Sequence, residues 1–129
     1  MPLIRFDLIA GRSSDDITAL LDAAHRAMVA AFDVADRDRY QVVHEHHPGR
    51  IIVQDNGLGI NRSDKVVVVS VTSRPRSQAA KLAFYENLVR ELHEHAGVEP
   101  HDVVVSIVEN SDSDWSFGHG RAQFITGEL

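Results

Sequence analysis

A long internal repeat constrains the fold of this 129-residue chain more than any other feature of its sequence. When the chain is aligned with itself at an offset of 64 residues, helix-starting, apolar and acidic positions of the first half meet similar positions of the second. Such self-similarity indicates one supersecondary unit that is present twice. The matched positions are Arg12 with Arg76, Ser13 with Ser77, Leu21 with Tyr85, Met28 with Leu92, Val34 with Val98, and Asp38 with Asp102.

The first half has the pattern of a strand, a helix and further strands. Apolar and polar residues alternate from Ile4 to Leu8, as in a half-buried strand. Ser13 has the position of an N-cap for a helix whose apolar stripe runs to residue 31. We expect a second strand at residues 40–43 and a short one at residues 50–54, before an Asn-Gly turn.

The second half repeats this order. Residues 66–71 form a nearly continuous β-branched run, which is typical of a buried strand. Ser77 caps a second helix that Gly97 ends, and residues 102–108 read as the last strand.

Two β-α-β units with right-handed crossovers would place both helices on one face of a four-stranded sheet. The sequence therefore predicts an α+β fold in a single domain, residues 1–129, with halves at about 2–60 and 61–129. The other sheet face would lack cover, and an uncovered apolar face on so small a domain predicts self-association.

Composition and charge exclude several function classes. The formal net charge is −6 and no basic run exists, so we expect no nucleic-acid partner. The chain has no cysteine, which excludes disulfides, thiol chemistry and thiolate metal sites. No basic segment followed by a long apolar one is present at the start, so we expect no signal peptide and no membrane span, and place the protein in the cytoplasm.

Pro2 directly follows the initiator methionine, which is usually removed before a residue as small as proline. Removal would leave a secondary amine that can serve as an acid or a base, or attack a carbonyl to give an iminium ion. Taken alone, Pro2 is more simply an ordinary residue at a solvated terminus. The repeat aligns Pro2 with Val66, at the start of a buried strand, and this favours a functional role.

Arg74 and Arg76 follow the third strand and precede the second helix. Two guanidinium groups beside a helix N-terminus suit a carboxylate ligand. Arg76 has a counterpart in Arg12, so it is equally well explained as a residue that frames the helix start, whereas Arg74 has no basic counterpart. On the residues alone, Asp38 is more simply a structural aspartate that opens a strand, because its repeat counterpart Asp102 also stands where a strand begins.

Residues 109–129 have no counterpart in the first half. Trp115, Phe117 and Phe124 could wall a dry pocket, although such aromatic residues more often serve packing. His44 and His46 would share one face of the second strand and could chelate a metal ion, but no motif places a third ligand. We therefore predict no metal site and a solvated strand.

Pro2 at the head of the first strand, the duplicated plan and the two arginines together resemble the tautomerase superfamily, whose members are small trimers or hexamers that use an amino-terminal proline. Within it, the chain looks like the malonate semialdehyde decarboxylases over essentially its whole length. The resemblance is carried by PLIRFDLIAGR, DRYQVV, DNGLG, SRPRS and VENSDSDWSFGHGRAQFITGEL, of which SRPRS and NSDSDWSFG are the most specific. The HEHH segment has no part in it.

The resemblance implies decarboxylation of malonate semialdehyde (3-oxopropanoate) to acetaldehyde and CO2, without a metal or cofactor, by a homotrimer. Pro2 would hydrogen-bond the aldehyde oxygen or form an iminium ion with it. Asp38, now read as functional, would keep the amine cationic or position it. Matched by motif, the catalytic residues are Pro2, Asp38, Arg74 and Arg76, and the substrate-binding residues are Trp115, Phe117 and Phe124.

Two other functions remain open. A tautomerase or hydratase of small 2-oxo acids or haloacrylate-type substrates would use a neutral Pro2 as base, its pKa lowered by the arginines rather than raised by Asp38. A non-catalytic ferredoxin-like binding module would show the same duplication. The pKa of Pro2, and the effect of Pro2→Ala on turnover and ligand affinity, distinguish these functions.

Overall fold

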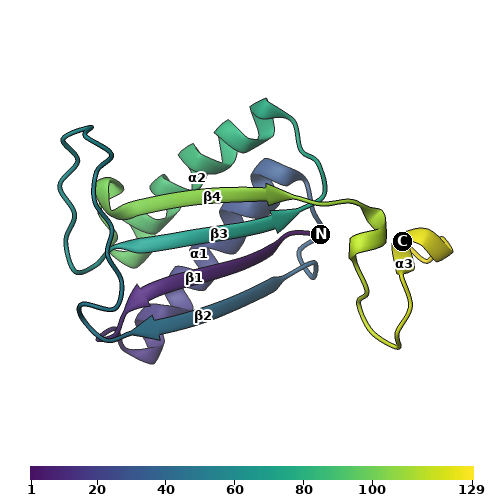
Figure 1. Cartoon of the computed structure of the whole chain (residues 1–129), viewed down its shortest axis with the longest axis horizontal. Helices are drawn as coiled ribbons and strands as arrows, with labels where there is room; N and C mark the ends of the chain where they lie inside the picture. Colours follow the sequence, from purple (N-terminus) through teal and green to yellow (C-terminus); the bar gives the residue numbers. More distant parts are fainter.

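Two β-α-β units form the body of the molecule, and a short tail follows them (Figure 1). The computed structural model describes residues 1–129. The first unit contains β1 (Leu3–Ile9), α1 (Ser14–Phe32) and β2 (Tyr40–His46). The second contains β3 (Val67–Ser73), α2 (Gln78–Ala96), the 3-10 helix η1 (Pro100–Asp102) and β4 (Val103–Glu109). The tail carries a second 3-10 helix, η2 (Asp112–Asp114), and α3 (Gln123–Thr126).

The four strands form one sheet in the order β2-β1-β3-β4. Each unit pairs its own strands in parallel, and the two units meet where β1 runs antiparallel to β3. Both long helices cover the same face of the sheet (Figure 1). The predicted α+β fold, with a four-stranded sheet and two helices on one face, is confirmed.

The two helices begin in the same way, as the repeat predicts. The hydroxyl of Ser13 accepts a hydrogen bond from the amide of Asp16, and the hydroxyl of Ser77 accepts one from Ala80, each at 3.1 Å. Such caps satisfy amide groups that have no partner inside the helix. At the other end, Gly97 stops α2 in the left-handed conformation, with φ at 65°.

The core lies between the sheet and the helices. Alternate residues of the two central strands are fully buried there, among them Phe6 of β1 and Val69 of β3. They pack against the apolar stripes of both helices, including Met28 and Phe84. The alternation predicted for β1 is confirmed, and β3, read as a continuously buried strand, buries alternate residues fully and leaves the others half-buried.

The prediction of a strand at residues 50–54 is wrong. Residues 47–66 form an irregular loop without ladder pairing, and Ile52 is 79% exposed. The loop is held by local bonds instead, because the Asp55 carboxylate accepts the amide hydrogens of Gly57 and Gly59. The predicted strand at 102–108 also starts one residue later, since Asp102 belongs to η1.

The sheet face opposite the helices, here called the open face, carries a mixture of apolar and polar side chains. Val68 of β3 and Val104 of β4 are half-buried there, as residues that alternate with the core positions. His46 Nε2 donates to Asp7 Oδ1 at 2.7 Å, and His44 Nδ1 lies 3.7 Å from the same oxygen. The sequence pattern did not reveal that the Asp7 carboxylate is a neighbour of both histidines.

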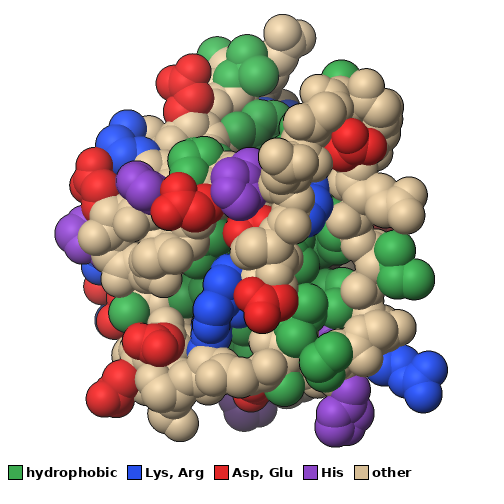
Figure 2. Space-filling view, turned by 90° about the vertical axis from the view of Figure 1, so that its left-hand side faces the viewer, with side chains coloured by type: hydrophobic (Ala, Val, Ile, Leu, Met, Phe, Trp, Pro, Cys, Tyr) green, Lys and Arg blue, Asp and Glu red, His purple; other side chains and the backbone are tan.

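No helix has both the length and the apolar character that crossing a membrane requires. Figure 2 shows the end of the molecule that bears the 47–66 loop, where acidic, basic, histidine and hydrophobic side chains are interspersed. No patch of one charge dominates this end.

Candidate active site

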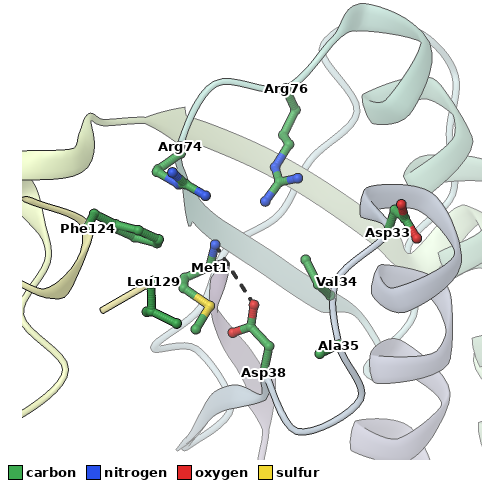
Figure 3. Close-up of a pocket in the computed structure, with 9 residues that line it drawn as sticks. All are labelled: Met1, Asp33, Val34, Ala35, Asp38, Arg74, Arg76, Phe124 and Leu129. Atoms are coloured by element: carbon green, nitrogen blue, oxygen red, sulfur yellow. Dashed lines mark ion pairs between the residues drawn. The ribbon is translucent and has the colours of Figure 1, made fainter. Parts of the chain in front are cut away.

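A pocket of about 360 Å³ lies at the end of the sheet where β1 starts and β3 ends (Figure 3). Its walls come from the chain start, the α1–β2 connection, the β3–α2 loop and the tail. The residues that line it are Met1, Asp33, Val34, Ala35, Asp38, Arg74, Arg76, Phe124 and Leu129.

The chain start occupies the middle of this pocket. The Met1 amine lies 4.0 Å from Asp38 Oδ2, with the two arginines on its other side (Figure 3). Pro2 is buried directly before β1, and Val66 is buried directly before β3. Met1, and not Pro2, lines the pocket.

Asp38 presents its carboxylate from the connection between α1 and β2. Its amide donates to the carbonyl of Ala35 at 3.0 Å, which closes a turn, and Oδ1 is buried without a hydrogen-bond partner. Burial raises the pKa of this carboxyl group, against the opposing effects of the Met1 amine and Arg76.

The electrostatic effects on the amine oppose one another. Burial lowers the pKa of the Met1 amine, Asp38 raises it, and Arg76 and Arg74 lower it, with a net decrease. The chain start is therefore an amine that can be neutral or cationic near neutral pH.

Arg76 is fixed by several partners. Its Nη1 donates to the carbonyl of Phe32 at 3.0 Å, its Nε to Ser73 Oγ at 3.3 Å, and its amide to Glu109 Oε2 at 2.8 Å. Burial lowers the pKa of Arg76, and the neighbouring Arg74 lowers it further. These bonds place a fixed positive charge beside the amine.

Arg74 is held between two residues of the tail. Its Nη1 lies 3.0 Å from Asp112 Oδ1, and its guanidinium carbon lies 3.8 Å from the centre of the Phe124 ring. Its Nε is buried and has no hydrogen-bond partner. Arg74 thus places a cationic group in the pocket wall, which suits an anionic ligand.

The three aromatic residues of the tail form one contiguous cluster. The ring centroids of Trp115 and Phe117 are 5.4 Å apart and nearly parallel, and Phe124 meets Phe117 edge-on at 5.4 Å. Only Phe124 lines the pocket. The other two rings lie behind it, where Phe117 also contacts Tyr40 of β2. Of the predicted pocket aromatics, the structure thus brings one into the wall.

A family model described as tautomerase enzyme matches residues 38–118, and a second with the same description matches residues 2–61. The chain is 52% identical, over 129 residues and 100% of both chains, to the probable tautomerase YrdN of Bacillus subtilis (strain 168). The chain belongs to the tautomerase superfamily. The expected resemblance is confirmed, and this tautomerase-superfamily enzyme is not the non-catalytic module that the sequence left open.

Two solved structures extend the comparison within the tautomerase superfamily. One is a malonate semialdehyde decarboxylase, studied for its decarboxylase and hydratase activities, with a TM-score of 0.97, 54% identity and 98% of each chain covered. The other is the FG41 malonate semialdehyde decarboxylase inhibited by 3-bromopropiolate, with a TM-score of 0.94, 41% identity and coverage of 98% of this chain and 97% of that one.

Several pocket residues of this tautomerase-superfamily chain escaped the sequence analysis. Val34 and Ala35 lie in a connection that reads only as polar, and Leu129 ends the tail segment, where no pattern marks it as a pocket residue. Asp112 belongs to a Ser/Asp-rich loop with no pattern that marks its contact with Arg74. No local signal could have found these residues, because the fold brings them to the pocket from separate segments.

Proposed function

We propose that this chain decarboxylates malonate semialdehyde to acetaldehyde and CO2, with Pro2 as its amino-terminal residue after removal of Met1. One observation carries the proposal. The chain start at Met1, Asp38 and two arginines share a single pocket in a chain that is 54% identical to a malonate semialdehyde decarboxylase.

Pro2 acts on the aldehyde group. Loss of CO2 breaks the bond between C1 and C2, and the electron pair left on C2 must be accepted by the neighbouring carbonyl. A cationic Pro2 amine stabilises the enolate oxygen by a hydrogen bond, or Pro2 condenses with the aldehyde and the iminium ion accepts the pair. A proton then adds to C2. Acetaldehyde leaves directly on the first route, whereas on the second route, in which the condensation releases water, a water molecule hydrolyses the iminium ion to free acetaldehyde and the Pro2 amine. Asp38 favours the cationic amine, as its effect on the pKa of the Met1 amine indicates.

The two arginines orient the substrate. Arg76 is pre-organised by its bonds to Phe32 and Ser73, so little reorganisation is needed when charge develops. Arg74 lines the pocket with its guanidinium group over the apolar ring of Phe124. An apolar wall next to the carboxylate removes water and favours neutral CO2.

A homotrimer is the proposed assembly. The open face carries half-buried valines such as Val68 and Val104, which a second copy would cover. A fused 4-OT described as a symmetric trimer has the same fold, with a TM-score of 0.78 at 21% identity and coverage of 97% of this chain and 98% of that one. A solution mass of three times the 14.3-kDa chain would support this assembly.

A second candidate is tautomerase or hydratase activity on small 2-oxo acids, with neutral Pro2 as the base. The observation that favours it is the pair of arginines beside the chain start, since burial, Arg76 and Arg74 lower the pKa of the Met1 amine and the same arginines would act on the Pro2 amine once Met1 is removed. A general base must be unprotonated at working pH. The relatives named probable tautomerase agree with this alternative.

The test follows malonate semialdehyde by proton NMR with the processed protein and with Pro2→Ala. Intact mass first establishes that Met1 is absent. Acetaldehyde from the first protein and not from the second is the expected result. If neither protein forms acetaldehyde, the decarboxylase proposal fails, and keto–enol exchange of phenylpyruvate tests the alternative.

A further inference from the structure

His25 is a buried titratable residue that the proposed mechanism does not use. It lies in α1, is 6% exposed and does not line the pocket. Its Nε2 lies 2.7 Å from the carbonyl oxygen of Asp36. Because a carbonyl oxygen only accepts hydrogen bonds, Nε2 must carry a hydrogen and donate it.

The bond from His25 reaches the middle of the turn that carries Asp38. Residues 35–38 form this turn, closed by the bond from the Asp38 amide to the Ala35 carbonyl. The Asp38 side chain accepts no hydrogen bond at Oδ1, and its Oδ2 only faces the chain-start amine. The place of this carboxylate therefore depends on its backbone, which His25 ties to α1.

The repeat supplies an internal comparison. The counterpart of His25 in α2 is Val89, which cannot donate a hydrogen bond. In that half the counterpart of Asp38, Asp102, is held directly, since its carboxylate accepts the amide of Ser63 at 2.7 Å and the hydroxyl of Ser63 at 2.5 Å. The helix carries Val89 in the half where hydrogen bonds hold the Asp102 carboxylate. It carries His25 in the half where the Asp38 carboxylate accepts no hydrogen bond.

We propose that His25 is a positioning residue, which holds the 35–38 turn through the Asp36 carbonyl and so places the Asp38 carboxylate beside the chain-start amine. Its effect on turnover rests on the proposed function. The prediction for the turn does not, because it concerns a hydrogen bond that exists without substrate.

Three variants test this role. His25→Val removes the donor and copies the other half, His25→Gln keeps a donor nitrogen at similar reach, and Val89→Ala is a matched control in α2. Amide exchange at Asp38 is expected to quicken about 10-fold in His25→Val, because one part-buried hydrogen bond is lost, and to return towards wild type in His25→Gln. Val89→Ala should leave it unchanged.

Steady-state kinetics with malonate semialdehyde provide the second measurement. His25→Val is expected to lower kcat about 10-fold with KM within about twofold, since Asp38 acts on the amine and not on substrate binding, and His25→Gln should recover most of kcat. Unchanged exchange in His25→Val, no recovery in His25→Gln, or an equal effect of Val89→Ala overturns the proposal.

Two further outcomes, an inactive wild-type protein and a variant that does not fold, still leave the role of His25 testable. If the wild-type protein has no decarboxylase activity, the proposed function fails, while amide exchange still decides the role of His25. If His25→Val does not fold, nitrogen NMR of the wild-type ring decides, because a hydrogen on Nδ1 with none on Nε2 would contradict the bond to Asp36.

Discussion

Asp38 and Asp102 occupy the same place in the repeat and have opposite electrostatic behaviour. Although burial alone would raise it, the bonds from Ser63 and the neighbouring His101 lower the pKa of Asp102. Asp38 has no such hydroxyl partner, and burial raises its pKa. A buried carboxylate that is kept without full hydrogen bonding is the pattern expected of a functional residue.

Asp38→Asn should therefore lose activity and gain stability. Without the carboxylate the terminal amine loses its stabilising partner, and turnover is expected to fall about 100-fold. Because the folded-state pKa of Asp38 is raised, its ionised form opposes folding above that pKa, so the neutral amide should raise the midpoint of urea unfolding at pH 7. Kinetics and urea titration of the same samples check both parts, and a less stable variant would contradict the electrostatic explanation.

Asp102→Asn should have the reverse effect on stability. The variant is expected to lose about 2 kcal/mol at pH 7, the usual contribution of a hydrogen bond to a charged group. Since the folded-state pKa of Asp102 is lowered, its contribution is complete above the unfolded value of about 3.9 and is lost as pH falls through the folded value. Urea unfolding at pH 7 and pH 3 should thus show a difference from wild type that shrinks at the lower pH.

At the scale of elements, the tail completes a pocket that the β-α-β units only begin. Its rings pack against one another, and it reaches the body through contacts such as Phe117 with Tyr40 and Asp112 with Arg74. The tail therefore determines how tightly Arg74 and Phe124 are held, while the core is formed without it.

Phe117→Ala should affect the site more than the fold. Phe117 lies between Trp115 and Phe124, so the substitution removes aromatic contacts of roughly 0.5–1.5 kcal/mol each. The expected outcome is a KM for the oxo acid raised about 10-fold, with a melting temperature lowered by roughly 5–10 °C, as the loss of these contacts implies for a domain of this size. Kinetics and calorimetry measure these effects, and a larger loss of thermal stability would show that the tail supports the core.

Elements defined by periodicity and capping could be predicted, and those defined by contacts between distant segments could not. The β-branched run at 66–71 and the caps at Ser13 and Ser77 are local patterns, and they form β3, α1 and α2. The 50–54 segment has strand composition but forms no ladder, and Ile52 and Val53 instead line hollows beside Val68 of the open face. Arg74 could be singled out from its position, and Asp38 only through the family resemblance. The partner of Arg74 in the tail and the contact of His25 with the Asp36 carbonyl appear only in three dimensions.

At the scale of the whole molecule, one sheet face is covered by helices and the other is not. Val68 of β3 alternates with buried core residues and points away from them. A charge placed there would be desolvated in an assembly of chains and solvated in a monomer.

If the chain forms the proposed homotrimer through the open face, Val68→Asp should yield a monomer, while Leu82→Asp should not. Leu82 is an apolar residue of α2, 52% exposed, on the helical side of the molecule. Leu82→Asp therefore makes the same apolar-to-acidic change away from the open face. Sedimentation equilibrium is expected to give the 14.3-kDa chain mass for the first variant and a trimer for the second. A trimer for both variants would place the interface elsewhere.

The repeat has a further consequence, for stoichiometry. The backbone nitrogen of Val66 occupies the place in the second unit that Pro2 occupies in the first, but it is an internal amide that donates to the Ser63 carbonyl. If Pro2 carries the reaction, duplication of the β-α-β unit doubled the scaffold without doubling the nucleophile. A reagent that alkylates the reactive amine should then saturate at one equivalent per chain. Each reactive amine would thus be supported by two β-α-β units.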